Sequence, residues 1–455
     1  MIEEYLEKLV FKVRDLNEKY DKVNKKEMSN VNLSNNLQVL NNQIALLRRD
    51  VNDLHTMMLL RSASSRLVKK NRLVFLGTGQ INENVLHAYL HFQRLLKQGD
   101  IQFQGEVLFV ARTKIEYELV KNFGYPCELW QYQAPLAYYL LETKVVVLSS
   151  HIWSEWGNCL LSHCIASAIK IQLWHGLPAK TIGASVIDSN MNFHHFASLL
   201  EDSAAVNHIC MQNDNIDVVS EYKRAFPLAK YHVTGDCRLD ILFNDEFQKL
   251  FLSHKSSHKL EEWLHNNRNR KKVIYSPTFR ENQDSRIIHY QKILELISEF
   301  SKSNIQLAIK LHVACGFSAE QRNHIVTNCN SNGFILIEDL DEVYSSFNSF
   351  DAMITDYSSI RIDYVLTGKP VFLWRFDKNS YNRTIDVVSL FSELDSILYN
   401  LSESNIAKYI EYVLEKDPKG NDRAKFINEK LKLSLDGLAA ERTIRVILDV
   451  INNDM

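Results

Sequence analysis

From residue 73 onward, short uninterrupted apolar segments alternate with segments that have the periodicity of amphipathic helices. Such continuous apolar segments are typical of strands buried on both faces of a parallel sheet. The chain has 455 residues, enough for more than one hydrophobic core. The pattern predicts an α/β fold with two doubly wound Rossmann-like domains, residues 73–250 and 251–455, and a closing C-terminal helix at 439–451. The predicted strands are residues 73–76, 106–111, 144–149, 169–174, 231–234, 272–275, 306–311, 334–337, 352–354 and 370–373.

Residues 1–60 have a different pattern, with apolar residues at alternating spacings of three and four, which predicts an N-terminal coiled coil. The stretch 24–32 breaks the register, so one continuous helix of about 80 Å and a hairpin of half that length are both allowed. The segment is interpreted as a homo-oligomerisation coil or as a spacer from a membrane or partner. Its two seams are Leu6, Leu9, Val13, Leu16, Tyr20 and Val23, then Leu33, Leu37, Leu40, Ile44, Leu47, Val51, Leu54 and Met58.

Residues 61–72 are predicted to be a basic linker, which is either simply solvated or a patch for anionic lipid. Its basic side chains are Arg61, Arg66, Lys69, Lys70 and Arg72.

Composition excludes several classes of protein. The net charge of -2 argues against nucleic-acid binding. The seven cysteines contain no C-x-x-C pair, and Cys159, His163 and Cys164 fit no common zinc spacing, so spare thiols in a reducing cytoplasm are expected. The N-terminus lacks an apolar signal region and no apolar run is long enough to span a bilayer. Any membrane association is therefore expected to be peripheral.

A histidine follows the predicted strand 169–174 in the segment Trp-His-Gly-Leu-Pro-Ala-Lys, residues 174–180. Gly176 and Pro178 force a turn there, which exposes His175 in a loop. An exposed imidazole at a strand end suits a general base. The structural alternative is a histidine that only packs beside the turn.

Two further segments carry cations at predicted strand ends. Arg280 follows the strand 272–275, with Ser276 and Thr278, and could hold a phosphate bidentately with the two hydroxyls as neutral donors. A surface arginine paired with Glu281 is the alternative. Lys310 and His312 close the strand 306–311, where two cationic side chains are costly to bury without an anion.

The fourth segment is Thr355-Asp356-Tyr357-Ser358-Ser359, which ends a strand and opens a predicted helix at 360–366. Its hydroxyls and the unpaired helix amides predict a phosphate cradle. An ordinary helix cap by Asp356 or Ser358 is the alternative.

Other motifs are weaker. Gly77-Thr78-Gly79 follows a strand, but Asn82 stands where a dinucleotide-binding fingerprint needs glycine. Asp339 and Asp341 have a D-x-D spacing that some metal-dependent glycosyltransferases use, in an acidic loop. No metal site and no cofactor are expected.

Taken in order, the four segments resemble the CDP-glycerol glycerophosphotransferase family of teichoic acid primases and polymerases, over residues 73 to about 450. The family's W-H-G-T-P-x-K, P-T-W-R, K-x-H-P and T-D-Y-S-S segments read here as WHGLPAK, PTFR, KLHV and TDYSS. The Gly-Asp-Cys-Arg-Leu-Asp at 235–240 and the Gly-Lys-Pro at 368–370 also agree. The resemblance implies a GT-B fold, with an acceptor side in residues 73–250 and a CDP-donor side in 251–455.

The resemblance implies that His175, His312 and Arg280 are catalytic. It places a donor-binding set at Ser276, Thr278, Lys310, Thr355, Asp356, Ser358 and Ser359. The sequence departs from the family pattern at four positions, which leaves the polyol of the donor open between glycerol, ribitol and another polyol. The departures are Leu177 for Thr, Cys237 for Pro, Phe279 for Trp and Val313 for Pro.

The implied reaction is attack by an acceptor hydroxyl on the β-phosphorus of CDP-glycerol or CDP-ribitol, with CMP leaving and His175 as general base. The acceptor would be a cell-surface polymer or its lipid-linked precursor, reached from the inner face of the plasma membrane. Two alternatives remain open. One is a GT-B glycosyltransferase of capsule or lipopolysaccharide assembly, and the other is a scaffold with an inactive cleft.

Overall fold

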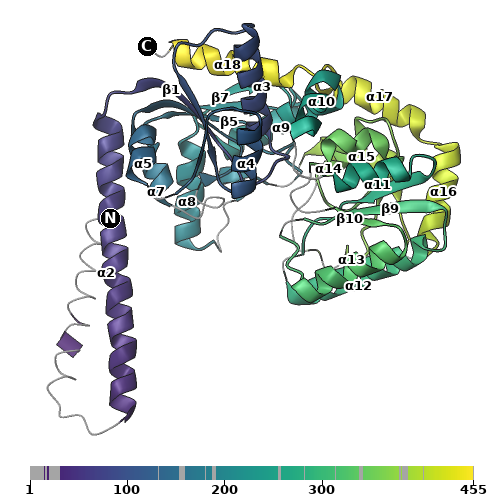
Figure 1. The fold of residues 1–455 in the computed structure, drawn as a ribbon, viewed down its shortest axis with the longest axis horizontal. Helices are drawn as coiled ribbons and strands as arrows, with labels where there is room; N and C mark the ends of the chain where they lie inside the picture. Colours follow the sequence, from purple (N-terminus) through teal and green to yellow (C-terminus); the bar gives the residue numbers. More distant parts are fainter. Residues whose placement is uncertain are drawn as a thin grey trace. The chain divides into compact units, whose positions relative to one another are not determined.

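The computed structural model describes residues 15, 18–19, 31–131, 133–152, 159–179, 181–186, 191–254, 258–280, 282–312, 314–337, 342–378, 381, 388–402 and 404–453. The chain divides into two compact units (Figure 1). The first comprises Met1–Lys69, Gln133–Glu142 and Asn158–Ala168, and the second comprises Lys70–Tyr132, Thr143–Gly157 and Ile169–Met455.

The first unit is built on the long helix α2, Val31–Arg66. This helix packs against α5, Ala134–Leu141, and α7, Cys159–Cys164. At its C-terminal end the hydroxyl of Ser64 lies 2.9 Å from that of Ser167. The second predicted seam falls on α2, whereas all six residues of the first seam lie outside the described residues.

The predicted basic linker is largely regular structure. Helix α2 continues to Arg66, and strand β1 already begins at Lys70, so only residues 67–69 lie between them. Helix α2 extends so far because nothing in residues 61–66 breaks a helix, and no proline or glycine occurs there.

The second unit contains two sheets, and every strand pair in them is parallel. The first has the order β3-β2-β1-β4-β5-β6-β7 and the second β10-β9-β8-β11-β12-β13. The first sheet consists of β1 (Lys70–Leu76), β2 (Glu106–Ala111), β3 (Cys127–Leu129), β4 (Thr143–Leu148), β5 (Ile169–Gln172), β6 (His208–Met211) and β7 (Lys230–Val233). The second consists of β8 (Lys271–Tyr275), β9 (Ile305–Lys310), β10 (Ile335–Ile337), β11 (Ala352–Thr355), β12 (Val371–Leu373) and β13 (Tyr399–Asn400).

Both predicted parallel sheets are confirmed, and the burial of strand β8 shows why. Val273 and Tyr275 pack in one hydrophobic cluster, whereas Ile274 between them packs in another on the opposite face. Figure 1 shows α12 and α13 on one side of this sheet and α11 and α15 on the other. Strands β3, β6 and β13 were not predicted, because each is at most four residues long and includes a polar or charged side chain.

Helices follow most strands, and several begin at side-chain caps. Thr113 and Ser318 each form a capping box with the residue three positions on, Glu116 and Gln321. The remaining helices of this unit are α3 (Asn84–Gln98), α4 (Lys114–Asn122), η1 (Gly183–Val186), α8 (Phe193–Ala204), α9 (Ile216–Ala225), η2 (Cys237–Leu242), α10 (Asp245–His254), α11 (Lys259–Asn266), α12 (Gln283–Phe300), α13 (Ala319–Ser331), η3 (Tyr344–Ser349), α14 (Ile360–Val365), α15 (Ser389–Ile397), α16 (Ile406–Lys416), α17 (Gly420–Lys430), η4 (Lys432–Leu435) and α18 (Ala439–Asn453).

The last helix returns the chain to the first sheet. Helix α18 packs against α3 and η2, and the Asp240 carboxylate accepts hydrogen bonds from the amides of Ala439 and Ala440 at 3.0 and 2.7 Å. The amine of Lys144 donates to the carbonyl of Ile451 at 2.6 Å. The predicted helix at 439–451 is therefore present, and it runs two residues further.

The order of strands reverses between β1 and β4 in the first sheet and between β8 and β11 in the second. In doubly wound sheets, ligands bind outside the carboxyl ends of the strands near such reversals. The segments that begin at Ser276 and Asp356 leave β8 and β11 at one reversal. The fold therefore places two of the predicted site segments side by side.

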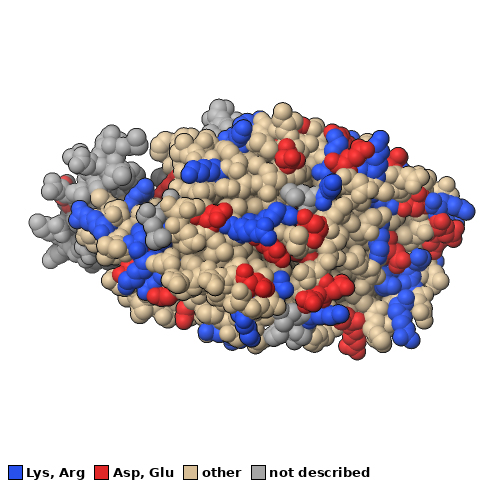
Figure 2. Space-filling model, turned by 90° about the horizontal axis from the view of Figure 1, so that it is seen from above, with Lys and Arg blue, Asp and Glu red and all other residues tan. Residues whose placement is uncertain are grey.

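Charge is mixed on the surface. Figure 2 shows Lys and Arg interspersed with Asp and Glu over the face seen from above. Within the described residues, no helix is long and apolar enough to cross a membrane.

A buried histidine makes stability depend on pH. His87 is fully buried, with its ring 5.7 Å from that of Phe247 and 5.4 Å from that of Phe251. Burial, followed by the charge of Arg238, lowers the pKa of His87 from 6.5 to about 3. Between these values the unfolded chain binds a proton that the folded chain does not, so stability falls as the pH falls below 6.5.

We expect His87→Phe to remove this contribution, which is about 1.4 kcal/mol per pH unit below pH 6.5. Thermal unfolding of the wild type and the variant from pH 4 to 8 measures it. The melting temperature of the wild type should fall more steeply on acidification, while the exposed control His265→Phe should follow the wild type. Parallel curves for wild type and His87→Phe would contradict the assignment.

Candidate functional site

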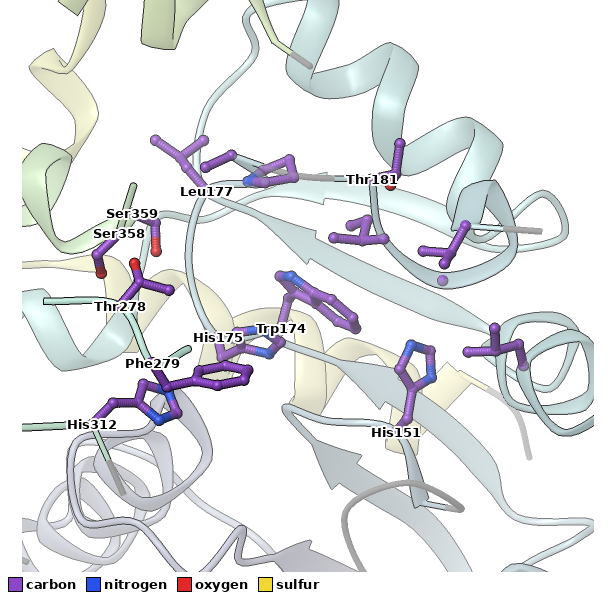
Figure 3. Close-up of a pocket in the computed structure, with 16 residues that line it drawn as sticks. His151, Trp174, His175, Leu177, Thr181, Thr278, Phe279, His312, Ser358 and Ser359 are labelled. Carbon is purple, nitrogen blue, oxygen red and sulfur yellow. The ribbon is translucent and has the colours of Figure 1, made fainter. Parts of the chain in front are cut away.

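Two adjoining cavities lie at the carboxyl ends of the strands in the second unit. The larger has a volume of about 380 Å³ and the smaller about 160 Å³. Figure 3 shows the larger one, with the labelled side chains of both sheets around it. The residues common to both cavities are His175, His312, Ser358 and Ser359. The structure thus brings together three of the four predicted segments at one shared wall. The remaining segment, which begins at Ser276, contributes Thr278 and Phe279 to the larger cavity and Ser276 to the smaller one.

His175 lies just beyond β5 in an unusual turn. Trp174 has φ 54° and Gly176 has φ 135°, and a Cβ at position 176 would lie 2.9 Å from the Arg238 guanidinium. Glycine is required there because of both the backbone angle and this close approach. The indole of Trp174 stacks on the imidazole, with the ring centroids 4.4 Å apart.

The hydrogen bond of His175 assigns its tautomer. Its Nδ1 lies 3.2 Å from the carbonyl oxygen of Ser149, at the end of β4. A carbonyl can only accept, so in the neutral ring Nδ1 carries the proton and Nε2 carries the lone pair. The ring is therefore oriented as a proton acceptor through Nε2.

His312 has the opposite arrangement. Its Nδ1 accepts a hydrogen bond from the backbone N–H of Ala314 at 3.0 Å. Because Nδ1 is the acceptor, the proton of the neutral ring is on Nε2. The ring lies 4.9 Å from that of Phe279, measured between centroids. The shared wall of the cavities thus carries one imidazole arranged to accept through Nε2 and one arranged to donate through Nε2.

Hydroxyl groups and one lysine line the cavities beside this shared wall. Thr278 lines the larger cavity, while Ser276 and Lys310 line the smaller one. The Thr278 hydroxyl is buried and has no hydrogen-bond partner within the described part of the chain. A buried hydroxyl in that state is a ready donor for an anionic oxygen of a ligand.

Arg280 follows β8, as predicted, but its side chain is turned into the protein interior. Its guanidinium is buried, and it pairs with Asp356 Oδ2 at 2.9 Å and with both carboxylate oxygens of Asp377, through Nε and Nη2. It also donates to the carbonyl of Thr278, and it lines neither cavity. In this structure the guanidinium is a buried anchor, because carboxylates occupy both sides of the fork, and its role as a phosphate clamp stays a prediction.

Asp356 and Thr355 also hold neighbouring loops in place. Asp356 is fully buried and accepts from the amides of Thr278 and Tyr357 at 2.8 and 2.6 Å. The Thr355 hydroxyl donates to the carbonyl of Ser276 at 2.7 Å. Neither lines a cavity, and their contact with the donor stays a prediction. They tie the loop after β8 to the loop after β11.

A family model described as CDP-glycerol:poly(glycerophosphate) glycerophosphotransferase matches residues 130–449, which is more than half of the chain. The chain belongs to this family. The resemblance stated from the four segments is thereby confirmed, and all four segments lie within the matched range.

Relatives in this glycerophosphotransferase family are distant. Staphylococcus aureus teichoic acid ribitol-phosphate polymerase TarL is 24% identical over 282 residues, covering 60% of this chain and 47% of that protein. Bacillus spizizenii teichoic acid glycerol-phosphate primase is 24% identical over 230 residues, covering 49% and 55%. The chain spans about half the length of these curated relatives.

Solved structures share the fold. The wall teichoic acid polymerase TagF superposes with a TM-score of 0.63 at 16% identity, covering 90% of this chain and 98% of that one. A putative UDP-N-acetylglucosamine 2-epimerase from Listeria monocytogenes gives a TM-score of 0.53 at 13% identity, covering 84% and 97%. At these identities the likeness concerns the fold alone.

Several polar side chains in the cavity walls were not predicted as site residues. They include His151, Glu83 and Asp363, while Arg238 belongs to the segment 235–240 that resembles the family. His151 follows an apolar strand as His175 does, so the same signal was present. Lys180, Glu281, Val313, Asp339 and Asp341 lie outside the described residues.

Proposed function

We propose that the chain transfers glycerol phosphate or ribitol phosphate from a CDP-polyol to a hydroxyl of a teichoic acid polymer or its lipid-linked precursor, and releases CMP. The observation that carries the proposal is the pair of oppositely arranged histidines, His175 and His312, on the wall common to both cavities. Family membership and the names of the relatives agree with this reaction class.

In the proposed reaction, Nε2 of His175 takes the proton of the acceptor hydroxyl as its oxygen attacks the β-phosphorus. The bond from that phosphorus to the bridging oxygen breaks, and CMP leaves with the bond electrons. The proton on Nε2 of His312 is available to an oxygen of the transferring group or of CMP. Ser149 and Ala314 hold the two rings in these tautomers through backbone hydrogen bonds.

Charge on the transferring group is proposed to be stabilised by Lys310, His312 and the hydroxyls of Ser276, Thr278, Ser358 and Ser359. Phosphoryl transfer depends mostly on positioning and electrostatic stabilisation, which these groups supply without a cofactor. Arg280 and Asp356 contribute indirectly, because they hold the loops that carry Thr278 and Ser358.

The deciding experiment measures nucleotide release from CDP-glycerol, CDP-ribitol and a panel of UDP-, GDP- and CMP-sugars. The acceptors are synthetic glycerol-phosphate and ribitol-phosphate oligomers. We expect CMP from one or both CDP-polyols and no nucleoside diphosphate from the sugars. Release of UDP or GDP alone would establish the glycosyltransferase alternative, and donor binding without turnover would establish the inactive scaffold.

The N-terminal segment is proposed to form a homo-oligomer through residues 1–60. In helix α2 the seam residue Met58 is 50% exposed, and Val39 and Leu46 beside the seam are 56% and 50% exposed. Exposed apolar side chains along a helix favour association with a second copy. Light scattering of wild type and Met58→Glu tests this, since the charge should lower the mass of the assembly and an unchanged mass would contradict it.

The division into an acceptor side at 73–250 and a donor side at 251–455 is also part of the proposal, as is peripheral binding at the inner face of the plasma membrane. Co-sedimentation with phosphatidylglycerol vesicles tests the membrane part. Equal recovery with neutral and anionic vesicles would argue against a charged membrane contact.

A further inference from the structure

The larger cavity extends past His175 to a third histidine, His151, which has no part in the reaction described above. His151 follows β4 and lines this cavity, and its Nδ1 lies 3.6 Å from a carboxylate oxygen of Asp202 on α8. Both side chains are largely buried, with 12% and 8% of their surface exposed. An imidazole and a carboxylate are thus paired at the far end of the cavity.

The indole ring of Trp174 contacts the rings of both His175 and His151. It stacks on His175 and meets the ring of His151 edge to face, with centroids 5.2 Å apart. Figure 3 shows the His175 ring between the hydroxyls of Ser358 and Thr278 on one side and the ring of His151 on the other. A molecule that reaches His175 from the His151 end would approach the phosphoryl position from the side opposite those hydroxyls.

The two cavities differ in the kinds of side chain that line them. The smaller one is lined by Lys310, Arg238, Glu83 and Asp363. The described lining residues of the larger cavity include neither lysine nor arginine. Its apolar lining residues include Leu177, Pro178, Ala179, Ile182, Val186 and Leu199. This lining suits an uncharged group with hydroxyls better than the lining of the smaller cavity does.

We propose that His151 binds the acceptor, with its imidazole hydrogen-bonded to a hydroxyl of the terminal polyol unit, so that a neighbouring hydroxyl reaches Nε2 of His175. Asp202 is a positioning residue that orients the imidazole, and the Trp174 indole packs against the carbon chain of the polyol. This assignment rests on the proposed function, and it separates an acceptor subsite at His151 from the donor phosphates at Ser358 and Lys310.

The test measures steady-state CMP release by the full chain while the CDP-polyol and a synthetic polyol-phosphate oligomer are varied in turn. His151→Asn should raise the KM for the acceptor about tenfold, as expected when a hydrogen bond to the substrate is lost, with the KM for the donor within about twofold. His151→Gln should raise the acceptor KM less, because its longer side chain places the amide near the position of the imidazole Nε2, whereas asparagine reaches only the position of Nδ1. The exposed control His265→Asn should change neither KM.

Asp202→Asn should raise the acceptor KM about threefold, and the double variant should cost less than the product of the two single effects because both act on one imidazole. Fully multiplicative effects would overturn the positioning role of Asp202. An increase in the donor KM instead of the acceptor KM, or an unchanged acceptor KM with an active wild type, would overturn the inference alone. A wild type that releases no CMP from either CDP-polyol would overturn the proposed function and the inference with it.

Discussion

Replacing His175 with glutamine is expected to lower kcat for CMP release by about 10²–10⁴-fold, the usual contribution of a positioned general base. Glutamine has a polar side chain of similar length but no basic nitrogen, so the proton acceptor is lost while the volume of the side chain is largely kept. Initial rates of CMP release at saturating donor and acceptor measure the effect.

The matched control is His265→Gln, an exposed histidine on α11, which should retain wild-type turnover and stability. Donor binding should survive in His175→Gln, because Ser358, Ser359 and Lys310 are unchanged. Turnover within threefold of the wild type in a folded His175→Gln protein would exclude His175 as the base.

Replacing Arg280 with alanine is expected to destabilise the fold by about 3–5 kcal/mol, since it leaves buried carboxylates without their cation. Asp356 is fully buried and the side chain of Asp377 is 6% exposed, so solvent cannot replace the guanidinium. Arg280→Lys should recover only part of the loss, because an ammonium group cannot form the bidentate pair with Asp377. Urea unfolding measures the change.

Arg268→Ala, an exposed arginine after α11, is the control and should unfold as the wild type does. The experiment also distinguishes the two roles considered for Arg280. A phosphate clamp predicts normal stability and a raised donor KM, so that pair of results would contradict the buried anchor.

The sheets were predictable because a strand that is buried on both faces is apolar along most of its length. It therefore appears in the sequence as a continuous apolar segment. Residues 144–149 and 306–311 show this, and β4 and β9 occupy them almost completely. Short strands such as β6, which begins at His208, have too few residues for their apolar side chains to form a clear pattern. They form only because neighbouring strands supply the hydrogen bonds.

The histidines were predictable for a related reason. His175 and His312 each follow a strand, and the carboxyl ends of parallel strands share an edge of the sheet. Their tautomers were not predictable, because these depend on the backbone of Ser149 and Ala314. Ser149 is 26 residues from His175 along the chain and reaches it only through the pairing of β4 with β5.

Local pattern alone determined most of the strands, in which order the loops with His175, Arg280, His312 and Ser358 appear, and which family those loops resemble. Tertiary structure decided what each side chain does. In the sequence Arg280 looks like an exposed cation near two hydroxyls. In the structure it pairs with Asp377, which is 97 residues further along the chain, and it does not line either cavity. The residues that surround a buried side chain come from segments that are distant in the chain. The partner of a buried charged side chain therefore cannot be predicted from its neighbours in the sequence.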